Sequence, residues 1–493
     1  MKEKRDREFD ERRLYRRRRR IRNQIIAYIT VGIFFVAIVV GAVIGVRKLM
    51  EIIAERRQAA EMERQLEEMQ QPDSENAVVE PPEPIEEAAV EEVDWLEEIV
   101  ESAIAPMPLE DKVAGLFVVK PESITGVGKV ITAGDATQEA LGKYAVGGLV
   151  YFAQNIVDKE QVKEMLSKTA SMSRYPIFLA VDEEGGSVRR VGSSIEVAQV
   201  GDMADIGAGG DAMAAYNAGA EIASYLYELG FNLDFAPVAD IVADVSSSAI
   251  GKRSFGGDPA AVGGMVSAAV GGLQDTGVSS CLKHFPGIGA ATEDTHEGMA
   301  TLEKTADDLR ASEFVPFKAG MDAGAHLVMV GHVSAPNLTG DNTPCSLSAE
   351  VITNLLRGEL GYNGIVITDA MDMSAITEYY DSGEAAVMAL KAGADMILMP
   401  EDFEAAYEGV LTAVRDGVIS EEQINESLRR IYRVKYRDRI DQDGNVVDNI
   451  SGQQAPVEGE GQEGVAAEGQ EGTAGEGQEG EAGEGQEGTV AEG

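Results

Sequence analysis

Eight short apolar runs alternate with longer helix-favouring stretches across the middle of the 493-residue chain, and no other feature restricts the fold as strongly. The runs are Leu116–Val119, Gly148–Phe152, Ile177–Val181, Leu233–Pro237, Val278–His284, Leu327–Val330, Ile365–Thr368 and Met396–Met399. Alternating strands and helices favour an α/β fold, and eight such units fit a (β/α)8 TIM-type barrel over residues 108–440. The alternative, a doubly wound open sheet, would favour a glycine-rich phosphate loop after its first strand. Val119-Lys120-Pro121 follows that strand and contains no glycine.

One transmembrane helix is expected before the barrel. Residues 25–46 are uncharged over 22 residues, which is long enough to cross a hydrocarbon core of ~30 Å. Arg47-Lys48 follows instead of a small-residue cleavage site, so the run predicts an uncleaved anchor. The basic segment 1–24 should stay cytoplasmic. The sequence therefore predicts a single-pass protein of the cell membrane, with a lipid bilayer bound by residues 25–46 and the barrel extracellular.

The segments that flank the barrel differ from it in composition. Residues 47–107 are expected to form a helical stalk (47–71) and then an acidic, proline-containing linker, with residues 72–104 as an extended spacer. The tail, residues 451–493, repeats EGQEG every eight residues and has almost nothing to bury, which predicts disorder. The stalk carries only a weak helical seam (Met62, Leu66 and Met69), so the oligomeric state stays open.

The charge and the few cysteines and histidines exclude several functions. The net charge of −43 would repel phosphate backbones, so nucleic acid is not an expected partner. Two distant cysteines, Cys281 and Cys345, cannot form a disulfide framework or a four-ligand zinc site, and four histidines leave little for a metal cluster. No metal or organic cofactor is expected.

Ionisable side chains stand where five consecutive predicted strands end. They are Asp182, Glu183, Glu184, Arg189 and Arg190 after the third, Asp234 and Asp240 at the fourth, Lys283 and His284 at the fifth, His332 at the sixth and Asp369 at the seventh. The carboxyl ends of barrel strands carry the active site in this fold. A polar set at that edge indicates a site for a polyhydroxylated ligand.

Five segments in this region resemble, in order, the motifs of glycoside hydrolase family 3. They read AVDEEGGSVRR (180–190), NLDFAPVADI (232–241), IGKRSFGGDP (250–259), KHFPGIGAATEDTH (283–296) and ITDAMDM (367–373). The resemblance covers roughly residues 108–437. Asp294-Thr295-His296 is similar to the Asp-x-His of the single-domain bacterial β-N-acetylglucosaminidases that act on peptidoglycan fragments.

The resemblance implies a role for each matching residue. Asp369 would be the nucleophile, and a carboxylate can form a covalent glycosyl-enzyme that water later resolves. His296 would be the general acid/base, with Asp294 holding its tautomer, since a histidine titrates near neutral pH. The implied substrate-binding residues are Asp182, Arg190, Arg253, Lys283 and His284, whose carboxylate, ammonium and guanidinium groups suit paired contacts to sugar hydroxyls.

Other residues in the region have plainer interpretations. Asp372 is a weaker candidate for the nucleophile, Arg189 and Lys252 are expected to be solvated, His332 could line the site or pack, and His326 should be structural. Ile288 is a departure, because the family's usual KHFPGHG reads KHFPGIG here, and loop shape or substrate preference could differ.

The sequence thus predicts a membrane-anchored retaining exo-β-N-acetylglucosaminidase that removes terminal GlcNAc from cell-wall or related glycans. Two alternatives within the family remain open, a β-glucosidase and a phosphorylase in which phosphate replaces water. A third is an inactive envelope protein that binds sugar.

Overall fold

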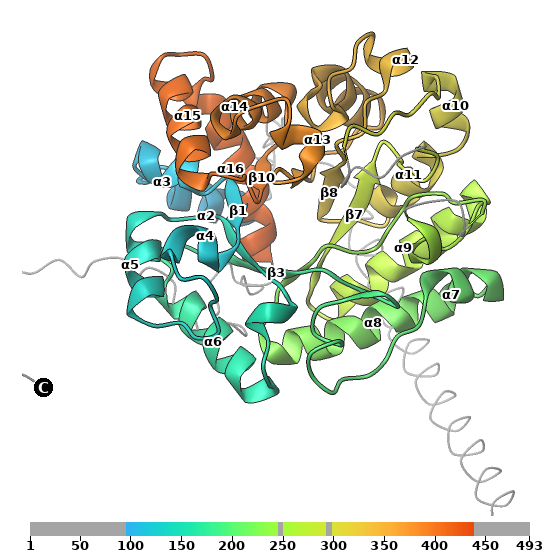
Figure 1. Ribbon diagram of the computed structural model, residues 1–493, viewed down its shortest axis with the longest axis horizontal. Coiled ribbons are helices and arrows are strands. Elements are labelled where there is room, and N and C mark those ends of the chain that lie inside the picture. The colour runs from blue at the N-terminus through green and yellow to red at the C-terminus, as the bar shows by residue number, and fades with distance from the viewer. Residues whose placement is uncertain (1–94, 245–249, 292–297, 438–493) are drawn as a thin grey trace, which may run out of the picture. The chain divides into compact units, whose positions relative to one another are not determined.

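Eight parallel strands close into a barrel in the computed structural model, which describes residues 95–244, 250–291 and 298–437 (Figure 1). Around the barrel the strands follow the order β1, β2, β3, β6, β7, β8, β9 and β10, and β10 pairs with β1. Their bounds are β1 Phe117–Val119, β2 Gly148–Tyr151, β3 Phe178–Val181, β6 Leu233–Asp234, β7 Ser279–Phe285, β8 Leu327–Val330, β9 Ile365–Ala370 and β10 Met396–Leu398. Each lies in a predicted apolar run or overlaps it. The predicted (β/α)8 barrel is therefore confirmed, and the open sheet is wrong.

Helices cover the outside of the barrel (Figure 1). Their bounds are α3 Leu109–Ala114, α4 Pro121–Thr125, α5 Asp135–Lys143, α6 Lys159–Met172, α7 Met203–Gly209, α8 Ala212–Leu229, α9 Pro259–Asp275, α10 Ala306–Ala311, α11 Phe314–Asp322, α12 Pro336–Thr339, α13 Ser374–Thr377, α14 Ser382–Ala392, α15 Phe403–Arg415 and α16 Glu421–Tyr436, with a π-helical segment η4 at Glu350–Glu359 and 3₁₀ turns η1 Ala153–Asn155, η2 Gly251–Arg253 and η3 Cys345–Leu347. Seven of these helices begin at an Asp, Ser or Thr whose side chain accepts a backbone N–H of the first turn, namely Asp158, Asp211, Asp258, Thr305, Asp381, Asp402 and Ser420.

Helices α8 and α9 pack closely on this outer layer, and small residues allow it. A Cβ on Gly272 would lie 2.1 Å from the carbonyl oxygen of Tyr216, and one on Gly219 would lie 2.7 Å from that of Ala269. Only glycine fits such contacts between backbones. The glycine- and alanine-rich sequences of both helices are thus explained by packing.

A helix that the sequence analysis does not expect precedes the barrel. Residues 72–104 are expected to be an extended spacer, but α2 spans Trp95–Ile104, with Val100 and Ile104 buried. Its acidic face pairs with α16, where Arg429 contacts Glu101 and Arg433 contacts Glu97. The expectation is wrong for these ten residues, because their apolar side chains recur at helical spacing and have a basic partner near the end of the barrel.

Several predictions lie outside the described residues. They concern the basic segment 1–24, the membrane span 25–46, the stalk 47–71, the repeat tail 451–493, and Asp294 and His296. Among the helices that the structure does describe, none combines the length and apolarity needed to cross a bilayer.

A short hairpin follows β3 and shapes the carboxyl end of the barrel. Strands β4 (Glu183–Gly185) and β5 (Val188–Arg189) pair in antiparallel register around a turn at residues 186–187, and both Gly185 at the end of β4 and Gly186 in the turn have positive φ. Glycine adopts this backbone conformation without the strain that a Cβ would bring. The hairpin brings Glu184 and Arg190 to the rim of the barrel.

Candidate active site

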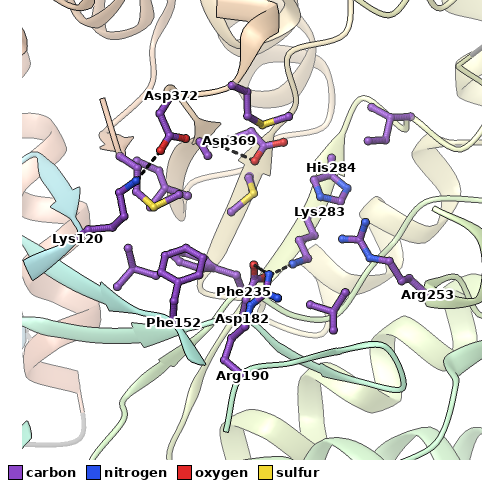
Figure 2. Close-up of a pocket in the computed structure, with 18 of the residues that line it drawn as sticks. Lys120, Phe152, Asp182, Arg190, Phe235, Arg253, Lys283, His284, Asp369 and Asp372 are labelled. Atoms are coloured by element: carbon purple, nitrogen blue, oxygen red, sulfur yellow. Dashed lines mark hydrogen bonds and ion pairs between the residues drawn. The ribbon is translucent and has the colours of Figure 1, made fainter. Parts of the chain in front are cut away.

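A cavity of about 750 Å³ opens at the carboxyl ends of the strands (Figure 2). All six of the described residues that the sequence analysis assigns to the site line it: Asp182, Arg190, Arg253, Lys283, His284 and Asp369. They come from β3, the hairpin, η2, β7 and β9, which are separated by up to 187 positions in the sequence (182 to 369). The remaining two, Asp294 and His296, lie in the segment 292–297 that is not described.

Lys283 is the centre of a buried charge cluster on one wall. Its Nζ lies 2.5 Å from Asp182 Oδ1 and 2.6 Å from Glu184 Oε1. Arg253 donates two hydrogen bonds of 2.8 Å to the two oxygens of Glu184. Burial alone would favour neutral acids, but the Lys283 ammonium outweighs it and lowers the pKa of Asp182 to about 2 and the pKa of Glu184 below its ordinary value. Asp182, Lys283 and Arg253 line the cavity and can accept from or donate to a sugar hydroxyl, while Glu184 lies behind them and holds the two cations in place.

His284 is held in one orientation by Asp240, which is fully buried. Asp240 Oδ2 lies 2.8 Å from His284 Nδ1 and accepts the backbone N–H of His284 at 3.1 Å. Its other oxygen accepts the N–H of Ile288 at 2.7 Å. Because a carboxylate accepts these bonds, Nδ1 carries the ring proton, and Asp240 fixes both the tautomer and the loop that follows β7.

Glu183 holds the turn that carries Arg190. It is completely buried, and its carboxylate accepts N–H groups of Val191 at 2.7 Å and Gly192 at 2.8 Å. Arg190 itself contacts Asp182 at 3.5 Å and lies over the ring of Phe152, 5.6 Å from its centroid. Within the described residues the buried Nε of Arg190 has no hydrogen-bond partner.

Asp369 lies at the end of β9, across the cavity from the charge cluster (Figure 2). Its Oδ1 accepts the N–H of Ala370 at 2.8 Å. Burial would raise its pKa, but the neighbouring His284, the Ala370 N–H and Lys283 together hold the pKa of Asp369 below its ordinary value. A half-buried carboxylate that stays ionised and faces a cavity can act as a nucleophile or stabilise a positive charge.

His332 and Asp234 are strand-end residues that do not line the cavity. His332 is fully buried and bonds Ser346 through Nδ1 and the carbonyl of Ala370 through Nε2, so it packs. Burial lowers the pKa of His332, which keeps it neutral. Asp234 is also fully buried, its Oδ1 accepts the N–H of Glu183, and burial raises its pKa well above the ordinary value.

The residues with plainer interpretations also have defined places. Asp372 lines the cavity but pairs with Lys120 at 2.7 Å. Lys252 is 63% exposed and pairs with Asp202. His326 lies where β8 begins, at the opposite end of the barrel. Cys281 and Cys345 are buried free thiols.

The sequence analysis counts Glu184 and Asp240 among the ionisable residues at strand ends but gives neither a role, and it does not count Lys120, which follows the first strand. The only available signal is their position at the carboxyl ends. Within the described residues, no group of three or more His, Cys, Asp and Glu side chains is arranged to hold a metal ion.

Comparison with known proteins accounts for this arrangement. The model of the glycosyl hydrolase family 3 N-terminal domain matches residues 108–434, about two thirds of the chain. The chain belongs to glycoside hydrolase family 3. The resemblance of the five motifs is therefore confirmed, and the family match contains the whole barrel and every described residue of the site.

Relatives within the family carry related names. A β-hexosaminidase A of Pseudoalteromonas piscicida is 31% identical over 326 residues, which cover 60% of this chain and 54% of that protein. A β-hexosaminidase of Stenotrophomonas maltophilia (strain K279a) is 35% identical over 274 residues, 54% of this chain and 80% of that one. The solved structure of a family 3 β-N-acetylglucosaminidase from Paenibacillus sp. FPU-7 superposes with a TM-score of 0.63 at 37% identity, covering 67% of this chain and 62% of that chain. The chain thus spans about half the length of the Pseudoalteromonas relative.

Proposed function

We propose that this chain is a retaining exo-β-N-acetylglucosaminidase that releases terminal GlcNAc from cell-wall or related glycans. The observation that carries the proposal is the placement of an ionised Asp369 across one cavity from the cluster of Asp182, Glu184, Lys283 and Arg253. The names of the family 3 relatives support the choice of GlcNAc as the sugar.

In the proposed first step an oxygen of Asp369 attacks the anomeric carbon of the sugar. The bond from that carbon to the leaving oxygen breaks, and the leaving oxygen takes a proton from His296, so a glycosyl ester of Asp369 forms. In the second step His296 takes a proton from water, the water oxygen bonds to the anomeric carbon, and Asp369 is released as a carboxylate. The configuration at the anomeric carbon is retained because it inverts twice.

The described residues would bind and orient the sugar. Lys283 and Arg253 donate to hydroxyls and Asp182 accepts from them, so adjacent hydroxyls can each find a partner, while Glu184 orients the two cations. Asp240 would keep His284 in place through the bonds of 2.8 and 3.1 Å. The low pKa of Asp369 matches its role, because only the carboxylate can attack.

The test compares turnover of chromogenic β-GlcNAc and β-glucoside by the full chain, with and without phosphate. We expect a preference for β-GlcNAc and a loss of about 10³-fold or more in kcat for Asp369→Asn. Asp372→Asn is the matched control, since Asp372 lines the same cavity but pairs with Lys120, and it should lose less than about tenfold. A 5-fluoro sugar should label the peptide that contains Asp369, as detected by mass spectrometry.

Other outcomes would select the alternatives. Equal or greater turnover of the glucoside would indicate a β-glucosidase, and a sugar 1-phosphate product would indicate a phosphorylase. A folded protein that binds GlcNAc without turnover would indicate a sugar-binding protein.

We also propose that residues 25–46 anchor the protein in the cell membrane with the barrel outside. The 22 uncharged residues and the basic segment before them support this proposal. The full chain should sediment with membranes and require detergent for release, whereas deletion of residues 25–46 should leave it soluble. Release of the full chain by high salt alone would contradict the proposal.

A further inference from the structure

We propose that Ile288 forms the wall that contacts the N-acyl group at C2 of the sugar, and that it sets the size of acyl group the enzyme accepts. The inference rests on the proposed function, because it assigns a residue to the part of GlcNAc that distinguishes it from glucose. Ile288 is the residue that replaces the second histidine of the KHFPGHG motif.

Ile288 is fixed in place from two directions. Its backbone N–H donates to Asp240 Oδ1 at 2.7 Å, and the other oxygen of Asp240 holds His284. Its side chain packs on a buried cluster of Val238, Val242 and Ile250 and also lines the cavity. The position of Ile288 relative to His284 is therefore set by one carboxylate, and its apolar surface is preformed.

Ile288 lies near the end of β8, the strand between the one that carries His284 and the one that carries Asp369. The strand order is β7, β8, β9, with His284 on β7, Asp369 on β9 and Gly331 directly after β8. A Cβ on Gly331 would lie 3.3 Å from His284 Cβ and 3.3 Å from Ile288 Cγ2. The bare backbone of Gly331 thus lets Ile288 lie over the end of β8, in the gap between His284 and Asp369.

A sugar bound with C1 at Asp369 and its C3 and C4 hydroxyls at the charge cluster has two edges. One edge carries the C2 substituent and the other the C5 hydroxymethyl group. In the proposed pose one edge faces Ile288, and the other faces the Lys120–Asp372 pair. Figure 2 shows that pair on the side of Asp369 opposite to His284.

The polarity of the two walls decides between the two orientations. The C5 substituent ends in a hydroxyl, and Lys120 and Asp372, each about one third exposed, offer both a donor and an acceptor for it. An N-acetyl group ends in a methyl, which has no hydrogen bond to lose against Ile288 and buries apolar surface there. The acyl group therefore lies against Ile288.

The test measures acyl selectivity in the full chain with three chromogenic β-glycosides: GlcNAc, N-butyrylglucosamine and glucose. Ile288→Ala enlarges the space, and we expect the kcat/KM ratio of N-butyryl to N-acetyl substrate to rise roughly tenfold, since one methylene in an apolar pocket has about that effect. Ile288→Phe reduces the space, and the ratio of GlcNAc to glucoside should fall roughly tenfold.

Val242→Ala is the matched control. Val242 belongs to the cluster beneath Ile288 but does not line the cavity. The control should lower Tm and leave both ratios within about twofold. Because each ratio compares two substrates on one protein, it is unchanged by partial misfolding of a variant.

Each outcome separates the inference from the proposed function. Unchanged ratios in both Ile288 variants, with β-GlcNAc still preferred, would overturn the inference alone. A shift in acyl selectivity in Lys120→Met, and not in the Ile288 variants, would mean that the sugar binds in the opposite orientation, with its acyl group at the Lys120–Asp372 pair. That result would also overturn the inference. A wild-type preference for glucoside would overturn the proposed function and the inference together.

Discussion

Buried charged side chains occur at both ends of the barrel, around Lys283 where the strands end and around Asp395 where they begin. At the beginning of the strands, Asp395 is fully buried, and Oδ2 accepts the Val366 N–H at 2.8 Å. The same carboxylate pairs with Arg357 at 2.5 Å and with Arg430 of α16 at 3.0 Å. Both oxygens are thus used within the protein, and the network ties η4 and α16 to the barrel.

At the carboxyl ends of the strands, charged side chains around Lys283 also contact a cavity. Lys283 and Arg253 also pair with carboxylates, but these two cations and Asp182 line a cavity. Charged groups that line a cavity can form hydrogen bonds with a ligand bound there. Buried charge alone is therefore a poor sign of a site, and the cavity next to it is the better sign. Substitutions at the two ends should separate activity from stability.

The largest expected effect is that of Lys283→Met. The substitution leaves Asp182 and Glu184 close together without the ammonium between them, so we expect kcat/KM to fall by about 10³-fold or more. Loss of one partner from a buried charge pair should also lower the free energy of unfolding by about 3 kcal/mol at pH 7. Enzyme assays and urea unfolding measure the two effects.

The stability that the Asp182–Lys283 pair contributes should decrease at low pH. The pKa of Asp182 is lowered to about 2 in the folded wild type, against about 3.9 in an unfolded chain. The stability from this pair is present above about pH 4 and is lost as the pH falls towards about 2. The difference in the free energy of unfolding between wild type and Lys283→Met should therefore shrink as the pH falls from about 4 to about 2. Lys252→Met, at a cation 63% exposed, is the control and should change neither activity nor stability. A difference in unfolding free energy that stays constant from pH 7 to pH 2 would contradict the conclusion that Lys283 lowers the pKa of Asp182.

The second prediction concerns Asp395, where the strands begin. Asp395→Asn replaces an anion that two arginines and one N–H share, and we expect a loss of about 2–3 kcal/mol in the free energy of unfolding. kcat/KM should stay within about twofold of wild type, because Asp395 lies outside the cavity lining. Asp307→Asn, at a carboxylate 93% exposed, is the control for loss of an ion pair and should cost less than about 0.5 kcal/mol. A large loss of activity in Asp395→Asn, with stability unchanged, would mean that the two ends are not separate.

Much of this contrast could be predicted from the sequence, and the reason is the geometry of the barrel. Short apolar runs predicted all eight strands, and the carboxyl ends of parallel strands meet at one edge. Lys283 and Asp369, 86 positions apart in the sequence, were therefore expected to share a site, and both line the cavity.

The remaining parts depend on side-chain direction and on distant partners. Glu183 and Glu184 are neighbours of one residue type, but Glu183 accepts backbone N–H groups of the Arg190 turn while Glu184 pairs with Arg253 and Lys283. No property of the pair Glu-Glu distinguishes the two roles. Helix α2 was missed because its acidic composition favours a spacer, and its partner α16 lies more than 300 positions later in the sequence.

The smallest expected effect belongs to His326, where β8 begins. Its Nδ1 lies 3.0 Å from Ser279 Oγ and its Nε2 accepts from Arg437 at 2.5 Å. Burial, and then the charge of Arg437, lowers the pKa of His326 to about 4. The unfolded chain takes up this proton near about pH 6.5, so stability is complete above that pH and is lost as the pH falls to about 4. The Tm of wild type should therefore drop between pH 7 and 4 by roughly 2 °C more than the Tm of His326→Gln. Parallel Tm profiles would show that His326 does not titrate in this way, and a changed KM at pH 7 would show that the beginning of the strands acts on the cavity after all.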